Sequence, residues 1–320
     1  MSARHIAWFV NKLPSLDVNF LAGSLDSRIT FTRAAGAATY FDSTGTLQNA
    51  GTNVARFDTD PASHAPLGLL VEAARTNVWL QSADANNAAW IKSQSGAGLP
   101  TTTANQTTAP DGTLTAAKII LPTATGSQFS TMAQFFNLGA VVASFSMWLK
   151  GNVGGEVVYI GTTPDGVNYY RTACTLTTSW QRFTLTTSAL TATNWFFTLG
   201  FDRRDTSQTT TTGCTIFAWG AQVEVGAFVT SYIPTTSASA TRAADVPTSV
   251  DTGWLNSGAG VAVLTAQTVP GVSANASQVG DGSHANPVAS LITATPSGRY
   301  RRMRYWQRSL TPSQLARALQ

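Results

Sequence analysis

The stretch VVASFSMWLK (residues 141–150) carries the clearest structural signal in this 320-residue chain. Its apolar and polar side chains alternate, which is typical of a β-strand with one face against a core. One face of this strand carries Phe145, Met147 and Leu149. The opposite face carries Ser144, Ser146, Trp148 and Lys150. The alternation therefore predicts that Trp148 points away from the core.

Seven further runs of strand length accompany this one, each separated from the next by turn residues. They are residues 116–121, 128–136, 156–161, 167–176, 180–186, 194–202 and 215–225. Eight strands at this spacing, without helical periodicity between them, favour an antiparallel β-sandwich of jelly-roll type in an all-β protein. Six aromatic residues of this region are expected in its core: Trp180, Phe183, Trp195, Phe197, Phe217 and Trp219.

The two ends of the chain have a weaker pattern than the sandwich, which we place at residues 81–240. Residues 1–80 read as an extended stem and anchor whose apolar run Leu67–Val71 needs a partner surface. Residues 241–320 begin at the end of a small, polar linker. They close with a strand at Arg299–Trp306 and a short helix at Ser313–Leu319.

Composition narrows the classes of function. Charged residues are 11% of the chain, roughly half the usual share. Six of the 20 basic residues lie in the last 22 positions, but no aromatic and basic nucleic-acid motif accompanies them, so nucleic acid is an unlikely partner. The apolar run Ile6–Val10 is too short for a signal peptide, and no stretch approaches a membrane span. We therefore expect synthesis in a cytoplasm, no membrane insertion, and free thiols at Cys174 and Cys214.

Residues for catalysis or metal binding are sparse. The three histidines lie far apart, and the chain has only three glutamates. Asp202 and Asp205 flank two arginines in the one dense charge cluster of the sandwich, which we interpret as a loop ion pair. The sequence shows no phosphate-binding loop, nucleophile elbow or zinc signature. We predict no catalytic residues, no metal and no cofactor, and hence not an enzyme.

Aromatic side chains on a sheet face offer a different kind of site. Flat rings commonly hold sugars by their C–H faces, while arginines and amides bond the hydroxyl groups. Alternation places Trp148, Tyr169 and Arg171 on faces away from the core, and these three are the candidate glycan-binding residues. The alternative is that Trp148 packs under a loop or against a neighbouring domain or subunit.

Eleven phrases in order along residues 16–245 resemble the phage head-spike or head-fibre family. They are LDVNF (16–20), DSRITFTRA (26–34), ATYFD (38–42), ARFD (55–58), GLLVEAARTN (68–77), APDGT (109–113), SMWLK (146–150), WQRFT (180–184), WGAQVE (219–224), TSYIPT (230–235) and TRAAD (241–245). The last six look like that family's jelly-roll module, which is itself similar to carbohydrate-binding modules.

The resemblance implies a structural protein displayed on the surface of a virion or gene transfer agent. Its expected partners are capsid or tail proteins, host surface polysaccharide and further copies of itself, with a trimer favoured. Residues 1–80 would then be the shared stem, with Met1–Lys12 at the attachment end. The rival functions are a glycan-binding module of a tail fibre and a polysaccharide depolymerase.

The end of the chain is similar to the closing strand and helix of a concanavalin-like lectin domain. The phrases are GRYRRMRYW (298–306) and LTPSQL (310–315). Such a domain is usually much longer than the C-terminal segment. Either most of its strands are missing, or this segment completes a neighbour's sheet.

Overall fold

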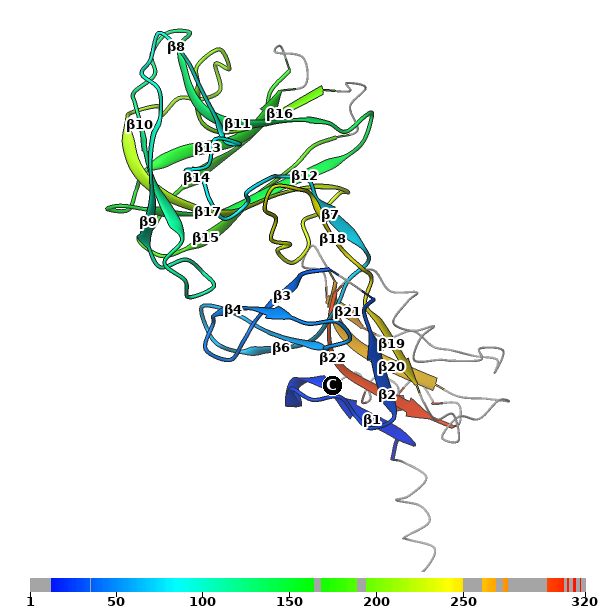
Figure 1. The fold of residues 1–320 in the computed structure, drawn as a ribbon. Coiled ribbons are helices and arrows are strands. Elements are labelled where there is room, and N and C mark those ends of the chain that lie inside the picture. The colour runs from blue at the N-terminus through cyan, green and yellow to red at the C-terminus, as the bar shows by residue number, and fades with distance from the viewer. Residues whose placement is uncertain are drawn as a thin grey trace, which may run out of the picture. The chain divides into compact units, whose positions relative to one another are not determined.

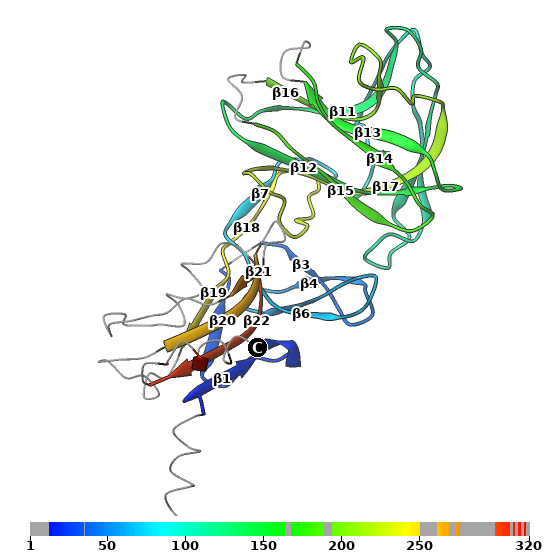
Figure 2. The ribbon, with the colours of Figure 1, turned by 180° about the vertical axis from the view of Figure 1, so that it is seen from behind.

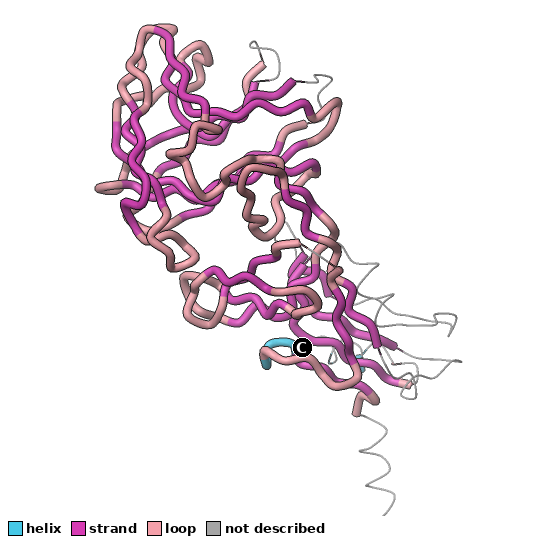
Figure 3. The backbone as a smooth tube through the Cα atoms, viewed as in Figure 1, coloured by secondary structure: helices cyan, strands magenta, loops and turns pink. Residues whose placement is uncertain are grey.

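The protein is described by a computed structural model, which covers residues 13–34, 36–163, 168–188, 194–249, 261–268, 273–275 and 298–307, with positions 310, 313, 314 and 317. Strands dominate these residues, and they pair in antiparallel sheets, as the sequence predicts (Figure 3). The expected attachment segment Met1–Lys12 and most of the expected helix Ser313–Leu319 lie outside the described residues.

The chain divides into two compact units. One, the sandwich unit, consists of residues 36–38 and 75–242. The other, the terminal unit, consists of residues 1–35, 39–74 and 243–320. The segments that we expected as a stem and as a separate C-terminal part therefore supply one unit together.

The sandwich unit is built from two five-stranded sheets (Figures 1 and 2). The front sheet has the order β14 (Tyr170–Thr175), β13 (Val157–Thr163), β16 (Asn194–Asp202), β11 (Phe129–Asn137) and β8 (Ile91–Ser95). The back sheet has the order β15 (Gln181–Thr186), β12 (Ala143–Gly151), β17 (Cys214–Val225), β10 (Ala116–Leu121) and β9 (Thr101–Thr107). A short pair, β7 (Arg75–Asn77) with β18 (Ala240–Arg242), lies where the chain enters and leaves the unit.

All eight strands that we predicted for this unit are present, within a few residues of their expected ends. Besides the short pair of β7 and β18, two strands of the five-stranded sheets, β8 and β9, were missed. Both are sheet-edge strands made largely of Ser, Thr, Gln and Asn, and most of their side chains are exposed. An edge strand without apolar alternation gives no periodic signal, which explains why they were not found.

The core of the sandwich lies between the sheets and is rich in aromatic rings. Phe145, Trp195 and Phe197 are fully buried there, as expected. Trp79 stacks on Phe145, with ring centroids 5.2 Å apart. Three of the other expected core aromatics, Trp180, Phe183 and Phe217, are only partly buried, and Trp219 is buried outside the core cluster.

The terminal unit is held together by a sheet that joins both ends of the chain. Its order is β21 (Ser273–Asn275), β20 (Val261–Thr268), β22 (Gly298–Trp306), β6 (Pro66–Val71) and β5 (Arg56–Thr59), and β1 (Leu16–Asn19) also pairs with β22. Two pairs of short strands accompany it: β2 (Ile29–Thr32) with β19 (Val246–Ser249), and β3 (Ala38–Phe41) with β4 (Leu47–Ala50). The strand expected at the end of the chain therefore completes a sheet of its own chain rather than a neighbour's.

This sheet corrects our interpretation of the apolar run Leu67–Val71. Its residues Leu69, Leu70 and Val71 are buried, and Leu69 pairs with Tyr300 of β22. Our inference of an oligomer rested on the view that this run lacks a cover within the chain, and that ground no longer holds. The oligomeric state itself remains a prediction.

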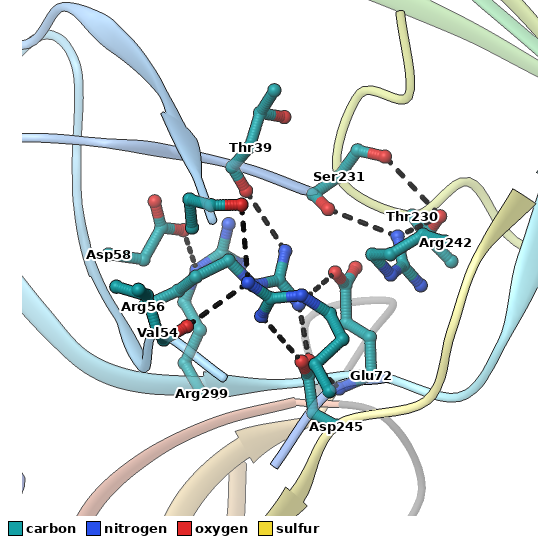
Figure 4. A network of polar contacts seen from close by, with 12 residues as sticks. Thr39, Val54, Arg56, Asp58, Glu72, Thr230, Ser231, Arg242, Asp245 and Arg299 are labelled. Atoms are coloured by element: carbon teal, nitrogen blue, oxygen red, sulfur yellow. Dashed lines mark hydrogen bonds and ion pairs between the residues drawn. The ribbon is translucent and has the colours of Figure 1, made fainter. Parts of the chain in front are cut away.

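A fully buried ion network ties the terminal unit together (Figure 4). Asp245 accepts hydrogen bonds from Arg33 Nη1 at 3.0 Å, from Arg56 Nη2, and from the backbone N–H of Glu72 at 2.9 Å. Arg56 also pairs with Glu72 at 2.8 Å and donates to the carbonyl of Thr39. Burial disfavours the charge on Arg56, but Glu72 and Asp245 outweigh it and hold the pKa of Arg56 above its ordinary value.

Two arginines of the basic C-terminal cluster pair with carboxylates of the same unit. Arg299 donates to Asp58 at 2.6 Å, and Arg302 forms two bonds with Asp17.

Both cysteines are free thiols, as expected, and burial raises the pKa of Cys174 to about 12. No helix within the described ranges is long and apolar enough to cross a membrane.

Candidate functional site

The outer face of the front sheet holds a groove of about 480 Å³. Directly paired residues of neighbouring strands point to the same side of a sheet, so the strand register shows which side chains face outward. Those that line the groove include Ile91, Ser93, Phe129, Thr131, Ala133, Thr163, Arg171, Phe196, Thr198, Asp202 and Arg204. This volume and this mixture of apolar and polar side chains are typical of small-molecule and cofactor sites.

One part of the groove is apolar and well exposed. Phe196 of β16 has 44% of its surface accessible, and the adjacent Phe135 of β11 has 45%. Their ring centroids are 4.8 Å apart in an edge contact. Ile91 of β8, also exposed, lies one strand further along the sheet, beyond Ala133. Because the two ring planes are inclined by 65°, the rings do not form one flat surface, but each offers an exposed apolar contact for a ligand.

The floor of the groove, between its apolar part and a charged part, carries hydroxyl groups on small side chains. Ser93, Thr131 and Thr198 line it with short side chains that can donate or accept a hydrogen bond. Gly200 lies next to them with φ +135°, and a Cβ there would stand 2.4 Å from the backbone oxygen of Ser130. Only glycine fits this position, and because it has no side chain, the space above the sheet stays open there.

The other part of the groove is charged, and Arg171 of β14 is its central group. Its Nε donates to Asp205, and its guanidinium lies 4.6 Å from the ring centroid of Tyr169. Gly161 of the next strand leaves room for the side chain, because a Cβ there would stand 3.0 Å from Arg171 Nη1. Nη2 is buried and makes no hydrogen bond, and it lies 3.7 Å from a carboxylate oxygen of Asp202.

Arg204 closes this charged part. It holds Asp202 through two parallel bonds of 2.7 and 2.8 Å, and its guanidinium lies 4.2 Å from the ring centroid of Phe129. The side chain of Asp202 is 5% exposed, whereas that of Arg204 is 44% exposed. The expected ion pair among these charges is therefore present, and it extends to Arg171.

Both carboxylates of this cluster are bound by cations. Burial alone would raise the pKa of Asp205, but the backbone N–H and hydroxyl of Ser207 and the guanidinium of Arg171 together hold it below its ordinary value. Asp205 is therefore ionised at neutral pH. The cluster presents hydrogen-bond donors to the groove with its charges compensated.

The three candidate residues from the sequence do not share one face. Arg171 belongs to β14 of the front sheet and lines the groove, and Tyr169 comes directly before this strand. Trp148 lies on β12 of the back sheet and is 4% exposed. Its ring packs against Trp219 and Tyr232 with centroids 5.5 Å away in each case, and the guanidinium of Arg182 covers it at 4.5 Å. The structure therefore agrees with the alternative that Trp148 packs under a loop, the one that carries Tyr232.

Sequence reasoning missed the aromatic part of the groove, although a signal for it was present. We placed Trp195 and Phe197 in the core, and alternation along the same strand points Phe196 to the opposite side. Phe135 follows by the same rule from the buried Met132.

The described residues contain no group of three or more His, Cys, Asp or Glu side chains placed to hold a metal ion. His64, the histidine with a described position, lies in a turn of the terminal unit with φ +59°.

No family model matches the sequence, and no curated protein matches it. Solved structures with similarity to the chain include the enzymatically active domain of tailspike protein 4 of bacteriophage CBA120. It has 11% identity and a TM-score of 0.33, and the match covers 47% of this chain and 21% of that one. The chain thus corresponds to about a fifth of the tailspike domain.

Two carbohydrate-binding modules also show similarity. TmCBM61 in complex with β-1,4-galactotriose has 14% identity and a TM-score of 0.34, over 47% of this chain and 99% of that one. A family 11 module from Clostridium thermocellum, in complex with a β-1,3-1,4-mixed-linked tetrasaccharide, has 11% identity and a TM-score of 0.34, over 49% and 98%. These low values leave the function to be argued from the groove itself.

Proposed function

We propose that the protein binds polysaccharide in the groove of the front sheet. The observation that carries this proposal is that one open groove combines the exposed ring of Phe196, which Phe135 contacts at its edge, with the buried Nη2 of Arg171, which makes no hydrogen bond. A sugar chain has alternating C–H faces and hydroxyl groups, and it can satisfy both features at once.

The division of labour follows from the geometry. Phe196 lies against the C–H face of one sugar ring. The hydroxyl groups of Thr131 and Thr198 form hydrogen bonds with the adjacent sugar rings. Arg171 Nη2 donates to a sugar oxygen, which would satisfy a polar group that is otherwise buried without a partner. Asp205 and Tyr169 hold the guanidinium in place for this bond.

The proposal is binding without hydrolysis. A glycosidase needs a pair of carboxyl groups, one of them protonated at working pH. The lowered pKa of Asp205 favours its ionised form, and both oxygens of Asp202 accept hydrogen bonds from Arg204. Release of reducing ends from a bound polysaccharide, lost on changing either aspartate, would contradict this part of the proposal.

We place the protein on the surface of a virion, where it would contact host polysaccharide. This part rests on the resemblance of residues 16–245 to phage head-spike proteins. Labelling purified particles with an antibody against the chain checks it directly by electron microscopy. A head or tail location would be visible in the same images, and particles without label would contradict it.

Fibres and spikes are usually homo-oligomers, so we expect light scattering to give a multiple of 33.7 kDa, with a trimer favoured. The measurement should use the full chain at micromolar concentration. A monomer under these conditions would contradict this expectation while leaving the groove proposal intact.

Replacing Phe196 with alanine is expected to weaken polysaccharide binding by about 1 to 3 kcal/mol, because it removes the stacking platform. The ring is 44% exposed, so the fold should lose little stability. A glycan array with the full chain identifies the ligand, and titration calorimetry then compares the variants.

Val225→Ala is the matched control, since Val225 is 47% exposed at the end of a back-sheet strand. It should bind like the unchanged protein. Equal affinity of Phe196→Ala and Val225→Ala would show that the groove is not the binding site.

A further inference from the structure

A second surface of the sandwich unit, on the outer side of the back sheet, combines lysines with partly exposed rings. Lys150 of β12 pairs directly with Phe217 of β17, and Phe217 pairs in turn with Lys118 of β10. Lys118 pairs with Thr103 of the edge strand β9. Directly paired residues share a face, so these four side chains form one row across four strands.

Trp180, just before β15, extends the row at its other end. The ammonium group of Lys150 lies 6.0 Å from the ring centroid of Trp180 and 5.7 Å from that of Phe217. The Trp180 indole donates to the backbone oxygen of Thr108 at 2.8 Å, which fixes the ring. We call Trp180, Lys150, Phe217, Lys118 and Thr103 the lysine–aromatic row.

The charges of this row are not compensated. Within the described part of the chain, neither Lys118 nor Lys150 forms an ion pair with a carboxylate. On the front sheet, by contrast, Arg171 and Arg204 are both paired with aspartates. The charged cluster of the front sheet is therefore compensated, whereas the two lysines of the row keep their positive charge and attract anions.

We propose that the lysine–aromatic row is a second binding surface, whose ligand is an acidic polysaccharide. Lys118 and Lys150 are two strands apart, about 9 to 10 Å at the backbone, on either side of the Phe217 ring. A sugar ring that lies on Phe217 places its acid groups, carboxylate or sulfate, within reach of the two ammonium groups. Thr103 supplies a hydroxyl at the edge of the same row.

Nucleic acid is the less favourable ligand for this surface. A protein that holds it through phosphates typically uses roughly 6 to 10 contacts from basic side chains. The row offers two lysines on either side of a ring, which are fewer cationic contacts than this mode of binding uses. A test with a nucleic acid probe decides between them.

The experiment measures binding of the full chain to polygalacturonate, to dextran sulfate and to neutral dextran, at low and moderate salt. We expect binding to the acidic polymers that weakens as salt rises. The double variant Lys118→Gln/Lys150→Gln should lose roughly tenfold in affinity for the acidic polymers and most of the salt dependence. Affinity for the groove ligand identified on the glycan array should not change.

Two controls separate this surface from the groove. Lys92→Gln removes an exposed lysine of the front sheet whose ammonium group donates to Thr102, and it should retain acidic-polymer binding. Phe196→Ala removes the groove platform and should also retain it. If Phe196→Ala instead abolishes acidic-polymer binding, the groove is the site and the row is not.

Three other results would overturn the inference. The first is a double variant that binds the acidic polymers as tightly as the unchanged protein. The second is an unchanged protein that binds neither acidic polymer at low salt. The third is tighter binding of single-stranded DNA than of polygalacturonate, lost in the double variant, which would assign the row to nucleic acid.

Discussion

Asp245→Asn is expected to lower the free energy of unfolding by about 3 to 5 kcal/mol. The carboxylate of Asp245 is fully buried and receives bonds from Arg33, Arg56 and the backbone of Glu72. Its removal leaves two buried guanidinium groups with one remaining carboxylate, Glu72, which pairs with Arg56. An uncompensated charge away from water costs far more than a lost surface ion pair.

Chemical denaturation followed by circular dichroism measures this effect. Asp17→Asn is the matched control, because Asp17 makes two bonds to Arg302 but its side chain is 36% exposed. Exposed pairs contribute about 0.2 to 1 kcal/mol, so the control should stay close to the unchanged protein. Losses of similar size in the two variants would contradict the role that we assign to the buried network.

Trp148→Ala is expected to cost about 3 to 5 kcal/mol of stability, as large buried aromatic residues do. The ring is 4% exposed and packs between Trp219, Tyr232 and the guanidinium of Arg182. A Cβ at the neighbouring Gly220 would stand 2.6 Å from this ring, so the indole fills its site closely. Truncation leaves a cavity that the surrounding strands can only partly close.

Thermal melting and polysaccharide binding should be measured together on this variant. Trp180→Ala is the comparison, because Trp180 lies on the same side of the sandwich but is only partly buried, and it should lose less stability. A small melting shift for Trp148→Ala together with a large loss of polysaccharide binding would show instead that Trp148 contacts the ligand.

The sandwich was predictable from the sequence because one face of each central strand carries apolar side chains into the core. Alternation in residues 141–150 and 194–202 reports that burial directly. The edge strands β8 and β9 escaped for the opposite reason: most of their side chains face water, and their amide and hydroxyl side chains fit loops equally well.

The terminal unit was not predictable in this way. Its sheet pairs residues near position 70 with residues near position 300, and local sequence carries no information on such long-range pairing. Four of the phrases that suggested a family each contribute a charged residue to the buried network: Arg33, Arg56, Glu72 and Asp245. The local sequence around each of these charges does not indicate that they are buried together.

The site was predictable in part. Arg171 was selected for its non-core position and does line the groove. Trp148 was selected by the same rule and is covered, because alternation tells which side of a sheet a residue faces but not what packs on that side. The loop that carries Tyr232 lies far from Trp148 in sequence, so only the structure could reveal that cover.

The central claim is that polysaccharide occupies the groove of the front sheet. A crystal structure of the full chain with the tightest oligosaccharide from the glycan array tests it most directly. We predict a sugar ring against Phe196 and a sugar oxygen within hydrogen-bond distance of Arg171 Nη2. Density for the oligosaccharide at another surface, with the groove empty at saturating ligand, would contradict the claim.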